Sequence, residues 1–391
     1  MVSNFPNHSI LQVCTGTSNS RRSLLQQKEE GEGGGGGGEA TNPIDSYWRC
    51  QANWEMNRKS YAKCALGFGR KTRGGENSRI YVVTDPSDSD MVNPKNGSLH
   101  YGVIQKEPLC IIFAHDMTVR LTQELIMTSN KTIDGCGANV HIANGAGITI
   151  QFVHDIIITN LHIHDIKATN GDDIRDSVDH YDQRTASDGD GINIFGSTNI
   201  WIDHLSMSNC KDGLIDTVMG STAITISNNH FSSHDHGLLL GANDTYADDK
   251  KMQVTVAFNH FGQGLVQRMP RVRWGFTHVV NNDYTHWEMY AIGGSTYPTI
   301  LRQGNRCVAS DSSAFKQVTH RDCTIEDVWK NWDWRSEGDL MENGAFFIQS
   351  RSPLKKESFS SEDMINPKPA TPVPELTRFA GALICTVGKP C

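Results

Sequence analysis

A short motif recurs at a nearly constant spacing through the middle of this chain of 391 residues. Runs rich in β-branched residues end on an asparagine, and a mostly apolar residue follows two positions later. The asparagines are Asn229, Asn259, Asn282 and Asn305, at spacings of 30, 23 and 23 residues. A period of about 20–30 residues with short strands is typical of a solenoid, in which each turn buries its inward side chains against the next. The asparagines are then expected to stack as a ladder.

The same repeat extends toward the N-terminus, and the sequence around it shows little of the periodicity that helices require. Ile163 and Met207 fit its apolar position and lie 44 residues apart, which is about two units. Helical periodicity is almost absent between residues 140 and 310. The alternative is a β-sandwich with evenly spaced strands, but the hairpin turns and strict alternation of a sandwich are scarce here. We therefore expect an all-β solenoid.

The two ends of the chain differ from this middle. Residues 1–42 include a glycine run and are expected to be disordered. Residues 47–66 are expected to form a short helix that covers an open end of the solenoid. Residues 43–350 would form the folded domain, and the irregular tail 351–391 would pack on its outside. Residues 1–20 contain no recognisable signal peptide, and no apolar stretch has the length of a membrane span.

The net charge and the cysteine spacing disfavour several classes of function. The net charge is −8, whereas a generic nucleic-acid-binding protein is normally basic. The ten cysteines include no CxxC pair, so zinc and thioredoxin-like sites are disfavoured. Three local pairs could close loops in an oxidising compartment, and free buried thiols are the alternative for each. These pairs are Cys50–Cys64, Cys307–Cys323 and Cys385–Cys391.

Four aspartates fall on neighbouring turns of the expected solenoid. Asp188 and Asp190 flank a glycine directly before a strand, and Asp212 and Asp216 follow Asp190 by 22 and 26 residues. Because residues one period apart stack, the four carboxylates are expected to converge on one face. Packed carboxylates repel one another, and a hard cation such as calcium relieves that repulsion. The alternatives are an ordinary turn or a solvated acidic face.

Basic and histidine clusters complete the candidate residues. Arg268, Arg271 and Arg273 follow about two turns later, where guanidinium groups could hold the carboxylates of an acidic polymer. An ordinary basic turn is the alternative. His230, His234 and His236 occupy alternating strand positions and are expected to be structural, as are the residues of the WIDH segment 201–204.

Several long stretches resemble one family. DGDGINIFGSTNIWIDH, DGLIDTVMGSTAITISNNHF and QVTVAFNHFGQGLVQRMPR are similar to the pectate lyases of plants, the branch that includes pollen allergens, and the resemblance covers residues 43–345. It implies a right-handed, single-stranded parallel β-helix. It also implies calcium ligands at Asp188, Asp190, Asp212 and Asp216. The catalytic base would be Arg268, and Arg273 would bind a substrate carboxylate.

The resemblance also marks departures from the family pattern. His236 stands where bacterial relatives carry a substrate-binding lysine, and Val272 and Trp274 replace residues usual in the plant branch. The substrate-binding set implied for this chain is therefore Arg273, Arg271 and His236.

The resemblance implies a calcium-dependent pectate lyase that cleaves de-esterified pectin by β-elimination. The expected enzyme is a monomer that binds polygalacturonate, is secreted to the cell wall, and binds neither nucleic acid nor membrane. Two alternatives remain at this point. One is a β-helix hydrolase with Asp190 and Asp212 as an acid–base pair. The other is a catalytically impaired pectin-binding homologue, suggested by His236, Trp274 and the lack of a signal peptide.

Overall fold

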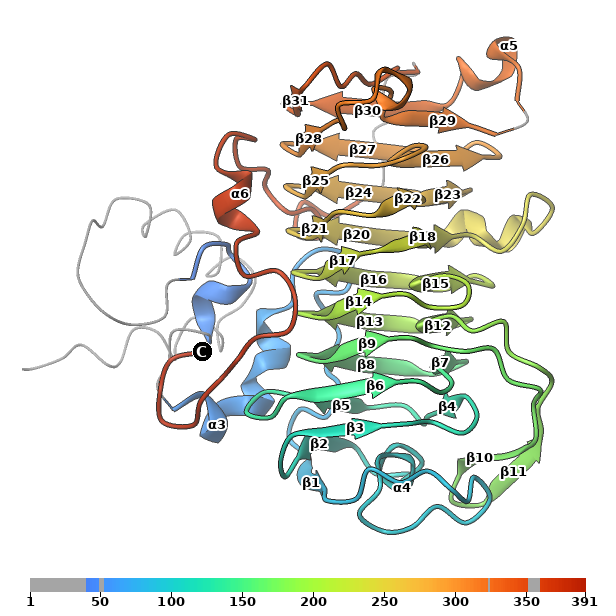
Figure 1. Cartoon of the computed structure of the whole chain (residues 1–391), viewed down its shortest axis with the longest axis vertical. Helices are drawn as coiled ribbons and strands as arrows, with labels where there is room; N and C mark the ends of the chain where they lie inside the picture. Colours follow the sequence, from blue (N-terminus) through green and yellow to red (C-terminus); the bar gives the residue numbers. More distant parts are fainter. Residues whose placement is uncertain (1–39, 49–52, 323, 351–358) are drawn as a thin grey trace, which may run out of the picture.

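The chain winds into a stack of coils, and each complete coil contributes one strand to each of three parallel sheets (Figure 1). The computed structural model describes residues 40–48, 53–322, 324–350 and 359–391. In one coil the chain passes through β12 (Ile192–Phe195), β13 (Thr198–Asp203) and β14 (Ser206–Ser208). The next coil repeats the path as β15 (Ile215–Val218), β16 (Thr222–Ser227) and β17 (His230–Ser232). The three sheets contain ten, nine and eight strands and are named here by these numbers.

The strands are short, as the alternation of β-branched runs with asparagine and glycine predicts. The ten-stranded sheet contains β1 Arg79–Val83, β2 Leu109–Phe113, β5 Lys131–Asp134, β8 His154–Thr159, β13 Thr198–Asp203, β16 Thr222–Ser227, β20 Gln253–Ala257, β24 Phe276–Val280, β27 Thr299–Gln303 and β30 Asp333–Glu337. The nine-stranded sheet contains β3 Met117–Val119, β6 Val140–Ala143, β9 His162–His164, β14 Ser206–Ser208, β17 His230–Ser232, β21 His260–Phe261, β25 Asp283–Thr285, β28 Arg306–Val308 and β31 Leu340–Glu342. The eight-stranded sheet contains β4 Leu125–Ile126, β7 Ile148–Gln151, β12 Ile192–Phe195, β15 Ile215–Val218, β19 Leu238–Leu240, β23 Arg271–Arg273, β26 Ile292–Ser295 and β29 Thr319–Arg321. Two small pairs lie outside these sheets: antiparallel β10 Asp173–Ser177 with β11 His180–Gln183, and parallel β18 His234–His236 with β22 Leu265–Gln267.

The core is a set of apolar columns along the solenoid axis. Ile200 pairs in register with Ile156 on one side and Ile224 on the other, and Ile224 pairs with Val254. All four side chains are fully buried. Met207 likewise stacks between Ile163 and Phe231, as the sequence frame predicts. The main sheets are built from parallel pairs, so the predicted right-handed parallel β-helix is confirmed and the β-sandwich alternative is wrong.

The predicted asparagine ladder is confirmed at the turn between the ten- and nine-stranded sheets. The side-chain amide of Asn229 donates to Asn259 Oδ1 at 3.0 Å, Asn259 donates to Asn282 at 2.9 Å, and Asn282 donates to Asn305 at 3.0 Å. Asn305 then donates to Asp339 Oδ1 at 2.9 Å, so an aspartate ends the ladder. Each amide also receives a backbone N–H, as Asn282 does from Asn259 at 3.0 Å. Neutral groups that donate and accept can satisfy one another at every turn.

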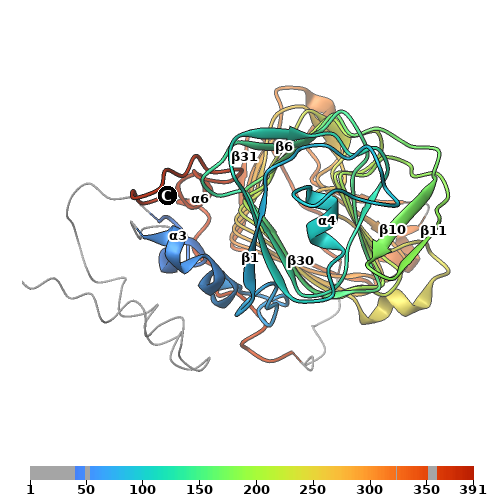
Figure 2. The same ribbon diagram turned by 90° about the horizontal axis from the view of Figure 1, so that it is seen from below.

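The N-terminal helical segment lies beside the solenoid and not over its end, which corrects the expected position. It consists of η2 Asp45–Tyr47, α3 Trp54–Asn57 and η3 Arg58–Cys64. The Tyr61 ring stacks on Trp201 of the ten-stranded sheet with ring centroids 4.5 Å apart. The first coil is instead covered by α4 Leu99–Val103, which Figure 2 shows inside the outline of the sheets. The outward face of β13 carries apolar surface, and the aromatic side chains of the N-terminal segment bury it.

The C-terminal tail follows the ladder side of the solenoid, on the same side as α3 (Figures 1 and 2). The backbone N–H of Lys368 donates to Asn281 Oδ1 at 2.8 Å, and that of Gly381 donates to the carbonyl of Asn228 at 2.7 Å. The remaining helices are α5 Glu326–Trp329, α6 Val373–Leu376, η4 Ala247–Lys251 and η5 Ser313–Phe315. In the described residues no helix combines the length and hydrophobicity that crossing a bilayer requires.

The three cysteine pairs have different outcomes. The Cys385–Cys391 disulfide is confirmed. Cys307 is a free buried thiol that contacts the Arg302 guanidinium at 2.9 Å, so the alternative of a free thiol holds at this position. Cys323 and Cys50 lie outside the described residues, as does most of segment 1–42.

The WIDH segment is structural, as predicted. The His204 imidazole is fully buried and its Nε2 lies 2.9 Å from Asp45 Oδ1 in the N-terminal segment. Its Nδ1 contacts the Gly381 carbonyl at 3.0 Å, so one ring joins both ends of the chain to the solenoid. Burial alone would lower its pKa, but the carboxylates of Asp45 and Asp203 raise the pKa of His204 to about 9.

Candidate functional site

The candidate residues gather on the outer face of the eight-stranded sheet. Asn193 on β12, Asp216 on β15, Leu239 on β19 and Arg271 on β23 are register partners along one column. The period of the coils therefore places an acidic position and a basic position on one face, two coils apart. The β10–β11 hairpin and the loop that contains η4 project from the same side of the solenoid (Figures 1 and 2).

Three of the four predicted aspartates form a tight cluster. Carboxylate oxygens of Asp188, Asp190 and Asp212 all lie within 4.8 Å of one another. No other three histidine, cysteine, aspartate or glutamate side chains come this close within the described ranges. Within these ranges the histidines at 230, 234 and 236 form no such group.

Asp216 borders this cluster from the neighbouring strand. Gly213 passes between the two acidic turns, and its N–H donates to Asp190 Oδ1 at 2.7 Å. A Cβ on Gly213 would collide with Asp216 Oδ1 and would lie 3.0 Å from Asp190 Oδ1. The glycine in the Asp212-Gly213 step therefore allows the two carboxylates to approach.

Burial and mutual repulsion make these acids hard to ionise. Burial, and then the charge of Asp188, raise the pKa of Asp190 to about 7. Burial, together with Asp190 and Asp212, raises the pKa of Asp216 well above its usual range, although Arg268 opposes the rise. A protein that holds such groups near neutral pH needs a compensating cation or a proton.

The donor set fits a hard divalent cation. Asp216 Oδ1 is buried and accepts no hydrogen bond from the described residues, and buried oxygens of this kind are ordinarily satisfied. Among those residues only Asn193, at 3.1 Å, and Gly213 donate to the Asp190 carboxylate. Clustered carboxylate oxygens are the ligands that calcium prefers.

The two outer arginines are fixed by acidic partners. Arg271 Nη2 lies 2.9 Å from Asp322 Oδ2, and Arg273 Nε lies 3.2 Å from Asp244 Oδ1. Arg273 Nη1 also donates to the Gly241 carbonyl at 3.0 Å. Burial, and then the nearby Arg271 charge, lower the pKa of Arg273. Both guanidinium groups are thereby held in one orientation on the face that contains the aspartates.

Arg268 occupies a constrained turn just before β23. Its φ angle is +61°, a left-handed conformation that a non-glycine residue rarely adopts. Its Nε is buried and has no hydrogen-bond partner among the described residues. Its charge acts on both Asp216 and Tyr290, which places the side chain between the acidic and basic parts of the face.

His236 faces the acidic cluster from β18. Its Nδ1 lies 3.0 Å from Asp212 Oδ1, and its Nε2 lies 3.7 Å from Asp235 Oδ2. The neighbouring His234 ring contacts the Asp212 backbone carbonyl. The residue at the expected substrate-binding position is thus in contact with a carboxylate of the acidic cluster.

Four contributors were not found in the sequence: Asn193, the Gly213 amide, Asp244 and Asp322. Asn193 could have been found, since it follows Asp190 by three residues and shares the column of Asp216. Asp244 and Asp322 carry no such signal, because both lie in loops outside the repeat and reach the arginines only through tertiary contact.

Comparisons with known proteins show similarity to pectate lyases and to a pollen allergen. A family model described as pectate lyase matches residues 114–331. "Probable pectate lyase 7" of Arabidopsis thaliana is 58% identical over 353 residues, covering 90% of this chain and 74% of that protein. A "Pectate lyase" of Lilium longiflorum is 56% identical over 352 residues, covering 90% and 81%. The crystal structure of jun a 1, the major allergen from cedar pollen, matches with a TM-score of 0.85 and 45% identity, covering 88% of this chain and 99% of that one.

Proposed function

This chain belongs to the pectate lyase family and is a pectate lyase, and from that premise we propose that its activity depends on calcium. The substrate is de-esterified galacturonan (polygalacturonate), and the products are unsaturated oligogalacturonides formed by β-elimination. One observation carries the proposal: three carboxylates lie within 4.8 Å of one another beside Asp216, on the face that also carries the arginines. That arrangement suits a cation shared with an acidic polymer.

The acidic cluster is the proposed cation site. Asp188, Asp190, Asp212 and Asp216 would hold Ca²⁺ through carboxylate oxygens. Bound calcium would supply positive charge that stabilises the carbanion formed next to the substrate carboxylate. The unsatisfied Asp216 Oδ1 and the raised pKa of Asp190 support the assignment, because a cation would relieve both.

The three arginines have two different proposed roles, substrate binding and proton transfer. Arg271 and Arg273 bind substrate carboxylates, and their ion pairs with Asp322 and Asp244 orient the guanidinium groups before the substrate arrives. Arg268, in its neutral guanidine form, would accept the proton from C5 while the bond from C4 to the glycosidic oxygen breaks, and the leaving oxygen would take a proton from water. His236, in contact with Asp212, adds a polar contact at the border between the cation site and the substrate.

The rest of the assignment follows the family. We propose a secreted, monomeric cell-wall enzyme whose partner is pectate, with no role for nucleic acid or membrane. Residues 43–350 would form the catalytic domain, and 351–391 would form a tail that stays attached along the ladder side.

The decisive experiment follows ultraviolet absorbance during incubation with polygalacturonate. Elimination creates a conjugated, absorbing product, whereas hydrolysis creates a reducing end that does not absorb. We expect absorbance to rise with added calcium and to stop with chelator. Reducing ends without absorbance would support the hydrolase with Asp190 and Asp212. Pectate binding without any product would support the catalytically impaired homologue, and either result would overturn the proposal.

A further inference from the structure

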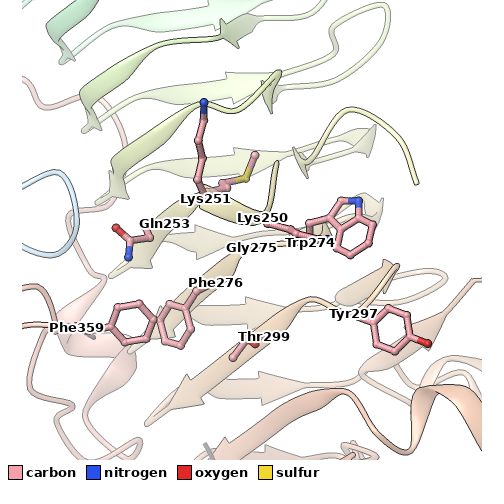
Figure 3. A pocket seen from close by; sticks show the side chains of 10 residues that line it. Lys250, Lys251, Gln253, Trp274, Gly275, Phe276, Tyr297, Thr299 and Phe359 are labelled. Carbon is pink, nitrogen blue, oxygen red and sulfur yellow. The ribbon is translucent and has the colours of Figure 1, made fainter. Parts of the chain in front are cut away.

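A second pocket lies at the turn between the eight- and ten-stranded sheets, away from the acidic cluster. Its volume is about 430 Å³, within the range of about 300–1,000 Å³ that is usual for small-molecule sites. Its walls include Lys250, Lys251, Gln253, Trp274, Tyr297 and Phe359. Figure 3 shows Trp274 and Tyr297 together at one end, with Phe276 and Phe359 at the other.

The pocket contains one ammonium group without an acidic partner. Lys250 is exposed, and in the described part of the chain it forms no ion pair. The Lys251 ammonium points away from Trp274 and Tyr297 (Figure 3) and lies over Gly220. The cationic side chains of the catalytic face differ, since Arg271 and Arg273 each already contact an aspartate. An unpaired cation on this wall favours an anionic ligand.

Aromatic rings define the shape of the same wall. Lys250 Nζ lies 4.6 Å from the centre of the Trp274 ring, and this cation–π contact keeps the ammonium over the pocket. The Tyr297 ring lies 6.5 Å from Trp274 and the residue is 57% exposed. An aromatic face packs against the C–H groups of a sugar ring, and the tyrosine hydroxyl can bond its hydroxyls.

Both aromatic residues adopt a conformation that bulky side chains rarely take. The φ angles are +56° at Trp274 and +55° at Tyr297, and the neighbouring Thr296 is at +66°. Glycine or asparagine would fit such turns at lower cost. Bulky aromatics held there support a binding role for the wall.

The lysines stand on an ordered loop. The buried Asp249 carboxylate accepts the N–H of Gly220 at 2.6 Å and the N–H of Ala242 at 2.7 Å. The Phe276 N–H donates to the Met252 carbonyl at 2.9 Å, which closes the loop against β24. The Lys250 ammonium group therefore projects from a fixed backbone.

The pocket and the arginine face share two segments of the chain. Trp274 directly follows Arg273, and the loop that contains Lys250 also supplies Asp244, the partner of Arg273. A chain of acidic sugars bound at Arg271 and Arg273 could therefore extend toward the pocket.

We propose that this pocket is an outer subsite that binds an additional galacturonate residue of the polymer, with Lys250 contacting its carboxylate and Tyr297 its ring. The inference rests on the proposed function, because it names where the same substrate extends. A neutral sugar would leave Lys250 without a partner, so the subsite discriminates in favour of de-esterified pectate.

The test compares a long substrate with a short one. We expect the double variant Lys250→Ala/Tyr297→Ala to lower kcat/KM on polygalacturonate about tenfold relative to kcat/KM on trigalacturonate, since a lost charge-assisted contact costs on the order of 1.4 kcal/mol. The loss should appear in KM, and Lys250→Arg should restore most of it. Lys71→Ala, another exposed lysine outside the pocket, should leave the ratio unchanged.

Three outcomes would overturn the inference. The long-to-short ratio could stay the same, the variant could lose activity equally on both substrates, or it could bind methyl-esterified and de-esterified polymer with unchanged preference. Thermal unfolding would verify that each variant folds. If the wild-type chain forms no unsaturated product, the proposed function fails, and the subsite is then judged by calorimetry with polygalacturonate in chelator. Equal affinity of wild type and double variant in that titration would refute it.

Discussion

The asparagine ladder and the aspartate cluster are two polar stacks in one solenoid. Both arise because residues one period apart meet on adjacent coils. In the ladder every amide donates to one neighbour and accepts from another, so the buried groups satisfy one another. In the aspartate cluster the same stacking brings together groups that only accept hydrogen bonds, and Asp216 Oδ1 is left without a donor.

The ladder shows that repeated neutral amides stabilise the fold, whereas the cluster shows that repeated carboxylates do not and need another explanation. A neutral amide lowers the free energy of the fold at each coil, whereas a carboxylate in the same geometry raises it. Four aspartates on neighbouring coils are therefore a cost to the protein without a cation. We infer that the cluster persists because it binds the ligand of the reaction, and that the ladder persists because it aligns the coils.

The largest effect is expected at Arg268. Arg268→Ala should lower turnover of polygalacturonate by about 10²–10⁴-fold, the usual contribution of a positioned acid or base. Calcium binding, measured by calorimetry, should stay within about twofold because no carboxylate is removed. Substantial residual lyase activity would show that another group accepts the C5 proton. Arg335→Ala, at a guanidinium outside this face, provides the matched control.

The ladder can be broken at its centre. Asn282→Ala removes the acceptor of both the backbone and the side-chain N–H of Asn259 and leaves that buried backbone N–H unsatisfied. It also removes one of the two donors to Asn305 Oδ1, which keeps the backbone N–H of residue 282. We expect the free energy of unfolding to fall by about 3–5 kcal/mol, since each such group costs about 1–3 kcal/mol. Urea unfolding would measure it. Calcium affinity of the folded fraction should not change, and a loss of calcium binding without loss of stability would contradict the division between the stacks.

The buried ion pair of His204 tests how the two chain ends are attached. The pKa of His204 is raised to about 9, so its contribution is complete below about pH 6.5 and is lost as pH rises through 9. His204→Gln should lower the unfolding free energy by on the order of 3 kcal/mol at pH 6 and by much less near pH 10. Burial raises the pKa of Asp203 to about 6, so Asp203 also titrates near the lower of these pH values, and the comparison is repeated at pH 7, above that titration. A constant difference across urea titrations at these pH values would contradict the charged pairing with Asp45.

The smallest effect has the opposite sign. Asp190→Asn should stabilise the calcium-free protein, because it removes a buried charge that repels Asp188. A pKa raised to about 7 corresponds to roughly 4 kcal/mol at full ionisation, and we expect about 1–2 kcal/mol to remain after the weaker hydrogen bonds from Gly213 and Asn193.

The same substitution that stabilises the calcium-free protein is expected to weaken calcium binding. Asp190→Asn should bind calcium about tenfold more weakly or worse, since a charged ligand is lost. Asp327→Asn, at an exposed acid on α5, should change neither quantity. Calcium affinity unchanged in Asp190→Asn would refute the cation assignment while leaving the fold argument intact.

The sequence predicted those structural features that follow from the spacing of the repeat. The apolar columns through Ile163 and Met207, the asparagine ladder and the proximity of Asp190 to Asp212 all follow from placing residues one repeat apart. Asp339 was missed as the last member of the ladder because its residue type differs, although its position is regular. The roles of Arg268, Arg271, Arg273 and His236 came from family resemblance and stay predictions.

Contacts between non-repeating segments were decided by the tertiary structure. The N-terminal helix lies along β13 and not over an end, Cys307 pairs with no cysteine, and Asp244 and Asp322 reach the arginines from loops. In a solenoid each coil touches only its neighbours, so one period read from the sequence specifies the stack and its register. Loops and termini have no period, and their position depends on which exposed face buries the most apolar surface and satisfies the most polar groups.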